Sequence, residues 1–183
     1  LPRNVLYADS ISCFIISILD NNKMKTENKN SMINEEKIPE NSELVIFDFY
    51  NTLVINQDRR LGLRDGASDL IMRLKLRRRR IVISSTSSIE EISQFPGFLH
   101  IKPFMDGIYG KEHVFKEGDH TYKDLGMICR GIGVEPERAI FIGDNYNDID
   151  RISATRFNIS LVVIPNGESN PNYDLKDLIT KWR

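Results

Sequence analysis

Short apolar runs alternate along this chain with segments whose apolar residues recur at helical spacing. Five of the runs read as buried strands; they are 43–48, 81–83, 106–109, 139–142 and 159–164. Helices are predicted at 66–76, from the capping-box pair Ser87 and Glu90 onward, at 122–132 and at 175–182. Because strands alternate with helices, we expect an α/β fold with a doubly wound, parallel five-stranded sheet covered by helices on both faces.

Residues 1–42 differ in composition from the rest of the chain, so we expect a flexible N-terminal tail followed by a folded domain at 43–183. The segment 20–42 is rich in Asn, Lys and Glu and holds almost nothing to bury. The apolar run 11–19 is shorter than the ~18 residues that span a bilayer. Two interpretations of this run stay open: a short docking helix, or untranslated sequence read as protein. A signal peptide is disfavoured, because one cation precedes the run and no cleavage pattern follows it.

Composition narrows the class of protein without identifying it. The 183 residues carry 25 basic and 26 acidic side chains, a balance that excludes both a polycation coating nucleic acid and an acidic disordered chain. The two cysteines, Cys13 and Cys129, are too few for a disulfide framework and indicate a reducing, cytoplasmic setting without membrane attachment. The arginine run 77–80 enters a strand at its amino end, away from the polar clusters described next, so nucleic-acid binding is not favoured.

Polar side chains follow three of the predicted strands at their carboxyl ends, the edge where open parallel sheets bind ligands. Asp48 ends the first strand, and Asp144 follows the fourth. Neighbouring strands lie ~4.8 Å apart, so these carboxylates would repel each other unless a cation lay between them. Oxygen ligands of this kind suit Mg²⁺, with Asp148 as a further ligand or a supporting acceptor. A carboxylate in such a site can attack phosphorus directly and form an aspartyl-phosphate.

These residues resemble, in type and order, the motifs of the haloacid dehalogenase-like (HAD) superfamily over about residues 43–165. Asp48-Phe49-Tyr50-Asn51-Thr52-Leu53 resembles the first motif, and Gly143-Asp144-x-x-x-Asp148 resembles the fourth. Ser84 after its apolar strand resembles the second motif, and Lys123 ahead of an amphipathic helix resembles the third. The first and fourth motifs together carry most of the resemblance.

The resemblance implies a Rossmann-like, HAD-like sheet in strand order 3-2-1-4-5. Asp48 would be the nucleophile, braced by Thr52. Mg²⁺ would be held by Asp48, the Tyr50 carbonyl and Asp144, with Asp148 in support. Ser84 and Lys123 would bind the phosphoryl oxygens. The neighbours Ser85 and Thr86 compete for the serine's role, and Lys111 and Lys116 for the lysine's role.

Tyr50 departs from the family's phosphatases, which carry a second aspartate two residues after the nucleophile. A phenol titrates near 10 and is a poor base at neutral pH, and the general acid–base help it fails to supply is worth roughly 10²–10⁴ in rate. We therefore expect a slow, Mg²⁺-dependent phosphomonoester hydrolase. Two alternatives stay open: a binding or regulatory module with degraded chemistry, and a metal-free haloacid dehalogenase, whose relatives carry tyrosine here.

The spacing between motifs predicts no cap domain. The segments from Asp48 to Ser84 and from Ser84 to Lys123 must already hold scaffold helices and a strand. An open site would accept a phosphorylated small molecule or a phosphorylated macromolecule. A second copy of the chain could also serve as the lid, so a homo-oligomer stays open.

Overall fold

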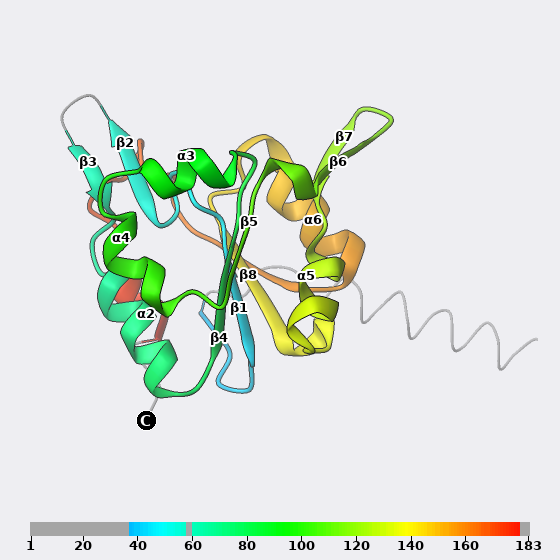
Figure 1. Cartoon of the computed structure of the whole chain (residues 1–183), viewed down its shortest axis with the longest axis horizontal. Helices are drawn as coiled ribbons and strands as arrows, with labels where there is room; N and C mark the ends of the chain where they lie inside the picture. Colours follow the sequence, from blue (N-terminus) through cyan, green and yellow to red (C-terminus); the bar gives the residue numbers. More distant parts are fainter. Residues whose placement is uncertain (1–36, 58–59, 180–183) are drawn as a thin grey trace, which may run out of the picture. The chain divides into compact units, whose positions relative to one another are not determined.

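The computed structural model describes residues 37–57 and 60–179, and a five-stranded parallel sheet forms their centre (Figure 1). Its strands are β1 (Leu44–Phe47), β4 (Arg80–Ser84), β5 (Gly107–Tyr109), β8 (Ala139–Gly143) and β9 (Ser160–Val163). They run in the order β5-β4-β1-β8-β9, which matches the order 3-2-1-4-5 predicted above. Phe47 of β1 pairs with Ile83 on one side and with Ile142 on the other. The carboxyl ends of the three central strands therefore lie level.

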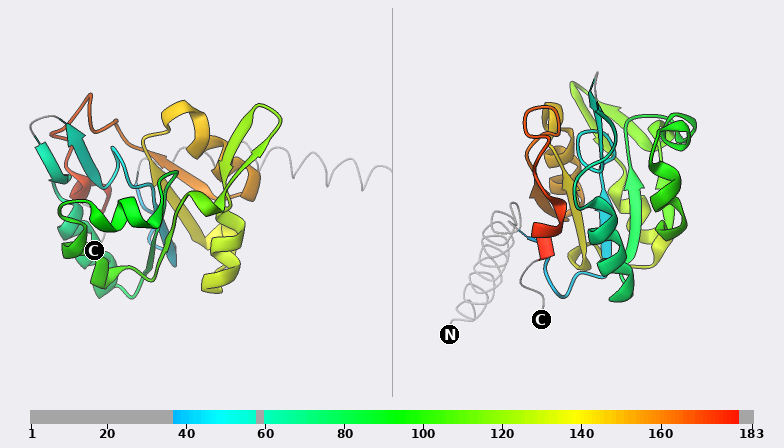
Figure 2. Two further views of the ribbon diagram at one scale, coloured as in Figure 1. Left: turned by 45° about the horizontal axis from the view of Figure 1, so that its top comes forward. Right: turned by 90° about the vertical axis from the view of Figure 1, so that its left-hand side faces the viewer.

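Helices cover both faces of the sheet, as expected for a doubly wound fold. On one side lie α2, α3 and α4, and on the other lie α5 and α6; the left view of Figure 2 shows the same division. Their bounds are α2 Ala67–Leu76, α3 Ile89–Gln94, α4 Phe98–Ile101, α5 Leu125–Ile132 and α6 Ile149–Phe157. Short 3₁₀ turns complete the layers at η1 (Lys102–Phe104), η2 (Lys111–His113), η3 (Pro136–Arg138), η4 (Tyr146–Asp148) and η5 (Leu175–Ile179).

The alternation of side chains along β1 explains why the sheet needs both helical layers. Val45 and Phe47 are buried in the cluster formed with α2, α3, α4 and η5. Leu44 and Ile46 are buried in the opposite cluster, with α5 and α6. Because successive side chains of a strand point to opposite faces, an apolar run without alternation requires cover on both sides.

The predicted start of α3 is off by one residue. The capping box is formed by Ser88 and Glu91 and not by Ser87 and Glu90. Ser88 Oγ accepts the Glu91 N–H at 3.2 Å, and Glu91 Oε2 accepts the Ser88 N–H at 2.7 Å. Both serines stand three residues before a glutamate, so spacing alone does not separate the two registers.

Two antiparallel hairpins were not predicted. The first pairs β2 (Val54–Gln57) with β3 (Arg60–Leu63), and the second pairs β6 (Val114–Glu117) with β7 (His120–Lys123). Tyr122 and Lys123 therefore lie on a strand and not on the predicted helix at 122–132. Helix α5 begins later, at Leu125, where the Asp124 side chain accepts the Met127 N–H at 2.8 Å.

The ends of the described segment pack against each other. Ile38, inside the expected tail, is buried, and its N–H donates to the Leu178 carbonyl at 3.1 Å. The last predicted helix is a 3₁₀ turn over Leu175–Ile179 as far as the description reaches, and Trp182 lies beyond it. The apolar run 11–19 also lies outside the described residues, and the boundary at residue 43 stays a prediction. Among the described helices, none combines the length and the apolar character needed to span a membrane.

Candidate active site

Asp48 stands directly after β1, at the level where the three central strands end. Its N–H donates to the Ile142 carbonyl at 2.8 Å, which anchors the residue to β8. The Thr52 hydroxyl lies 3.4 Å from Asp48 Oδ2 and donates to it, from four residues further along the chain. Asp48 is only 9% exposed, so its carboxylate depends on protein groups, and not on bulk water, for most of its stabilisation.

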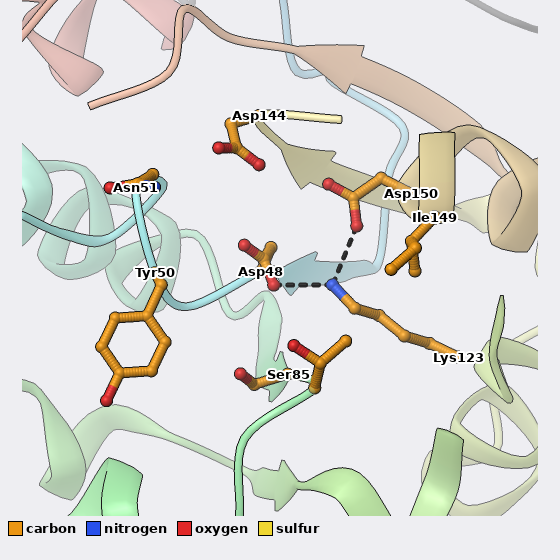
Figure 3. A pocket seen from close by; sticks show the side chains of 9 residues that line it. Asp48, Tyr50, Asn51, Ser85, Lys123, Asp144, Ile149 and Asp150 are labelled. Carbon is orange, nitrogen blue, oxygen red and sulfur yellow. Dashed lines mark hydrogen bonds and ion pairs between the residues drawn. The ribbon is translucent and has the colours of Figure 1, made fainter. Parts of the chain in front are cut away.

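Three carboxylates meet at this edge of the sheet: Asp48, Asp144 and Asp150 (Figure 3). One oxygen from each lies within 4.8 Å of the other two. Asp48 and Asp144 come from adjacent strands, as the sequence predicts. Asp150 comes from the first turn of α6 and was not predicted.

Asp150 occupies the place that the sequence assigned to Asp148. The Asp148 side chain is 56% exposed, bonds to Arg151 and lies outside the carboxylate cluster. Asn145, Asn147 and Asp148 have positive φ angles, and this winding of the loop brings Asp150 to the sheet edge. A Cβ on Gly143 would lie 2.0 Å from Asp150 Oδ2, so only glycine permits this approach. The sequence signals for this placement are Gly143 and the presence of a further aspartate, Asp150, two residues after Asp148.

Lys123 bridges two of the three carboxylates. Its Nζ lies 2.6 Å from Asp48 Oδ1 and 2.8 Å from Asp150 Oδ1, and the side chain is 2% exposed. The Lys123 N–H donates to Ser153 Oγ at 2.8 Å, which ties the end of β7 to α6. Lys116 and Lys111 are exposed. Of the three candidate lysines, the structure thus brings only Lys123 to the carboxylates.

This cluster contains three carboxyl groups and one ammonium group, so acidic groups outnumber basic groups. Burial raises the pKa of the Asp48 carboxyl to about 7; Asp150 and Asp144 act in the same direction, and Lys123 opposes them. Burial by itself would lower the pKa of Lys123, but Asp48 and Asp150 outweigh it and raise the pKa above its ordinary value. Lys123 therefore stays protonated, and its single charge is shared by two of the three carboxylates, Asp48 and Asp150.

A cavity of about 90 Å³ opens above Asp48 and is lined by residues from all these loops. Ser85 and Thr86 line it after β4, whereas Ser84 is the last residue of β4 and is not among the lining residues. The sequence favoured Ser84 for the phosphate-binding hydroxyl, with Ser85 and Thr86 as competitors. The lining of the cavity favours these two competitors, and the role itself stays a prediction. Tyr50 and Asn51 line the other wall. The Tyr50 ring points away from the three carboxylates in Figure 3 and packs edge-on against Phe49 and Phe95.

A larger groove adjoins this cavity. It measures about 760 Å³ and lies between the β6–β7 hairpin and α6. Ile149 lines both spaces. The groove walls are mixed: isoleucines of α6 lie beside charged and polar side chains, Asp119 and His120 from the hairpin and Arg151 and Arg156 from α6. A molecule whose phosphoryl group filled the small cavity could thus extend over Ile149 into the groove.

The residues present fit a bound Mg²⁺. The cluster offers only oxygen ligands, from carboxylates close enough to share one ion, and hard divalent cations prefer such ligands. The excess negative charge around Asp48 favours a cation in the same place. The nearby Lys123 ammonium and Ser85 hydroxyl suit the oxygens of a phosphoryl group.

A family model described as haloacid dehalogenase-like hydrolase matches residues 15–164. Among solved structures, a mutant of CbbY from Rhodobacter sphaeroides in complex with xylulose-1,5-bisphosphate is 14% identical, with a TM-score of 0.51, covering 68% of this chain and 87% of that chain. A HAD-superfamily hydrolase of subfamily IA from Geobacter sulfurreducens is 13% identical, with a TM-score of 0.52, covering 68% and 92%. A phospho-aspartyl intermediate analogue of phosphoserine phosphatase is also 13% identical, with a TM-score of 0.50, covering 78% and 99%. At these identities the structures share a fold with this chain. A comparison with curated proteins gives no match.

Proposed function

The chain belongs to the haloacid dehalogenase-like hydrolases, and we propose that it is a phosphatase that hydrolyses phosphomonoesters through Asp48 with the help of Mg²⁺. One observation carries this proposal. Lys123 Nζ lies within 2.8 Å of both Asp48 and Asp150, which are buried, in a cluster that also holds the partly buried Asp144. A nucleophile, a fixed positive charge and a set of oxygen ligands thus surround a cavity of about the size of a phosphoryl group.

In the first step, an Asp48 carboxylate oxygen attacks phosphorus. The new O–P bond replaces the ester O–P bond, and the alcohol leaves with a proton taken from water. In the second step, water attacks the aspartyl-phosphate, releases inorganic phosphate and restores the Asp48 carboxylate. Lys123 and the Ser85 hydroxyl hold the phosphoryl oxygens, and Thr52 braces the Asp48 side chain. The groove beyond Ile149 receives the leaving group.

Asp48, Asp144 and Asp150 would hold the Mg²⁺, together with the Tyr50 carbonyl. When bound, the ion neutralises charge that develops on the phosphoryl oxygens. Asp150 takes the supporting role that the resemblance assigned to Asp148, because the Asp150 carboxylate is in the cluster and the Asp148 carboxylate faces solvent. Catalysis then rests on positioning and charge neutralisation, as in other phosphoryl transfers.

Tyr50 limits the rate of this reaction. Burial, assisted by Glu91, raises the pKa of the Tyr50 hydroxyl above its ordinary value, so the phenol does not act as a base at neutral pH. Proton transfer to the leaving group and from the attacking water therefore depends on solvent. We expect slow turnover, with aryl phosphates hydrolysed faster than alkyl phosphates because an aryl oxide leaves without protonation.

The test is release of p-nitrophenol from p-nitrophenyl phosphate, with and without Mg²⁺, by the wild type and by Asp48→Asn. The substitution keeps the size of the side chain and removes the nucleophile. Wild-type activity that requires Mg²⁺ and is absent in Asp48→Asn is the expected result. Asp69→Asn is the matched control, because Asp69 is exposed on α2, and it should retain full activity. Equal release by Asp48→Asn and the wild type would overturn the assignment of the nucleophile.

The second candidate function is a phosphate-binding or regulatory module, which Tyr50 favours because it supplies no carboxylate beside the nucleophile. Inorganic phosphate would then bind to the wild type in the presence of Mg²⁺, and no phosphomonoester would be hydrolysed. Release of chloride from 2-chloropropionate without metal would instead identify a dehalogenase. The three carboxylates argue against the metal-free dehalogenase, because bringing them together at this depth is costly unless a cation is bound.

A further inference from the structure

The chain after β9 contacts both acidic loops of the site through two consecutive residues. Asn166 Nδ2 donates to Asp144 Oδ2, in the loop after β8. The Gly167 N–H donates to the Asn51 carbonyl at 3.0 Å, in the loop after β1. Residues 166–173, called the strap below, therefore connect the loops that carry Asp144 and Asp48, although these loops end different strands.

The Asn166 side chain is held in one orientation. Its Oδ1 accepts the Glu168 N–H at 2.8 Å, and its backbone carbonyl accepts the Asn170 N–H at 2.9 Å and the Ser169 hydroxyl at 3.0 Å. Because Oδ1 faces a donor, the amide NH₂ faces Asp144, and a carboxylate oxygen can only accept from it. The turn thus aims a donor at Asp144.

Gly167 and Arg64 both join the strap to the loop after β1. A Cβ on Gly167 would lie 3.1 Å from both the Cα and the carbonyl oxygen of Asn51, so glycine allows the two backbones to approach. Arg64 is 1% exposed. Its guanidinium donates to the carbonyls of Asn51 at 2.7 Å, of Asn170 at 2.9 Å and of Tyr173 at 3.3 Å. One buried cation thus joins the Asp48 loop to the strap.

We propose that Asn166 is a positioning residue that orients the Asp144 carboxylate for a divalent cation, and that the strap holds Asp144 and the Asp48 loop at the separation that the cation needs. The inference rests on the proposed Mg²⁺ site. Like charges push Asp144 away from Asp48 and Asp150, and the Asn166 amide opposes this rotation before any ion is bound. Partners of this kind, which bind a ligand residue and not the ion, are typically worth 10–100-fold in metal affinity.

The experiment compares the wild type with Asn166→Ala, Asn166→Gln and Asn170→Ala. Asn170→Ala is the matched control, because Asn170 is exposed on the same strap and joins it through its backbone N–H and carbonyl. Isothermal titration calorimetry with MgCl₂ gives the dissociation constant. The melting temperature without metal reports the fold, and kcat and KM for p-nitrophenyl phosphate are measured at rising Mg²⁺.

Asn166→Ala should raise the Mg²⁺ dissociation constant by about 10-fold or more and leave the metal-free melting temperature within a few degrees of the wild type. Its kcat should recover toward the wild-type value at saturating Mg²⁺, because the nucleophile and Lys123 are intact. Asn166→Gln keeps an amide donor and should recover part of the lost affinity, and Asn170→Ala should match the wild type.

An unchanged Mg²⁺ dissociation constant in Asn166→Ala would overturn the inference and leave the proposed function standing. An equal rise of the Mg²⁺ dissociation constant in Asn170→Ala would also overturn it. So would a rise in Asn166→Ala that is accompanied by a matching fall of the metal-free melting temperature, since either result indicates a general destabilisation of the strap. A wild type that binds no Mg²⁺ would overturn both the metal site and the inference. The activity of Asp48→Asn then decides separately whether Asp48 is the nucleophile.

Discussion

Lys123 Nζ lies 2.6 Å from Asp48 Oδ1, although 75 positions separate the two residues along the chain. Lys123 ends a hairpin strand on the side of the sheet covered by α6, and Asp48 ends the central strand β1. Both side chains are buried, so Lys123 stabilises the charge of Asp48, and Asp48 and Asp150 together stabilise the charge of Lys123. Removing one partner of a buried ion pair leaves the other charge uncompensated, which costs about 3–5 kcal/mol.

Lys123→Met should therefore damage both stability and activity. Methionine keeps the volume of the side chain and removes the charge that Asp48 and Asp150 share. Without metal at pH 7, the free energy of unfolding in urea should fall by about 3 kcal/mol. At saturating Mg²⁺, kcat/KM should fall by about 10²-fold or more. Lys116→Met on exposed β6 should change neither value, and near-wild-type turnover in Lys123→Met would contradict the role of Lys123.

The next test decides which aspartate after β8 supports the proposed metal site, and it compares Asp150→Asn with Asp148→Asn. Asp150 faces Asp48 and Asp144, whereas Asp148 pairs with Arg151 at the surface. Asp150→Asn should weaken Mg²⁺ binding in calorimetry by about 10-fold or more and should slow turnover. Asp148→Asn should leave both within about twofold, because the Asp148 carboxylate is exposed, lies outside the cluster and forms only a surface ion pair. The reverse ranking would restore Asp148 as the supporting carboxylate.

Tyr50→Asp should raise turnover if the missing acid and base limit the rate. General acid–base help is worth roughly 10²–10⁴-fold, and we expect at least about a tenfold gain in kcat. The gain should be larger for alkyl phosphates than for p-nitrophenyl phosphate, because alkoxides need a proton to leave. Tyr50→Phe is the control and should show no gain. Equal rates for Tyr50→Asp and the wild type on both substrates would argue that another step is limiting.

The contacts of Asp106 indicate that the free energy of unfolding falls in acid, independently of the active site. Burial alone would raise the pKa of its carboxyl, but bonds from Lys75 Nζ at 2.8 Å and from the Ile81 N–H at 2.7 Å outweigh it and hold the pKa below its ordinary value. A lowered folded-state pKa stabilises the protein above the unfolded pKa of about 3.9. This stabilisation is lost as the pH falls through the folded-state pKa.

Asp106→Asn should accordingly lower the free energy of unfolding by about 1–2 kcal/mol at pH 7. The difference from the wild type should shrink as the pH falls below about 4. Urea denaturation between pH 7 and pH 3 measures both effects. Asp119→Asn, in the exposed turn of the β6–β7 hairpin, is the control and should follow the wild type throughout. A difference that stays constant with pH would show that the Asp106 carboxylate does not titrate with a lowered pKa.

The arrangement of the sheet could be predicted from the sequence because it depends on local signals. Five apolar runs alternate with helical segments, and the resemblance of the polar residues at the strand ends supplies the strand order. The same signals bring Asp48 and Asp144 together, since both directly follow strands that pair in register. Helix ends with a local stop were equally predictable, and Gly133 caps α5 with a positive φ as its sequence context indicates.

The rest of the candidate site depended on contacts between distant segments. The sequence by itself determined that carboxylates, hydroxyls and a lysine gather at one edge of a parallel sheet. Only the tertiary structure decided which of them face the cavity: Asp150 instead of Asp148, Ser85 instead of Ser84, and Lys123 from a strand instead of a helix. The physical reason is that these side chains are selected by contacts between segments far apart in the chain, such as the bonds from Lys123 Nζ to Asp48 and Asp150, and by the left-handed backbone at Asn145, Asn147 and Asp148. Residue spacing alone does not specify either of these.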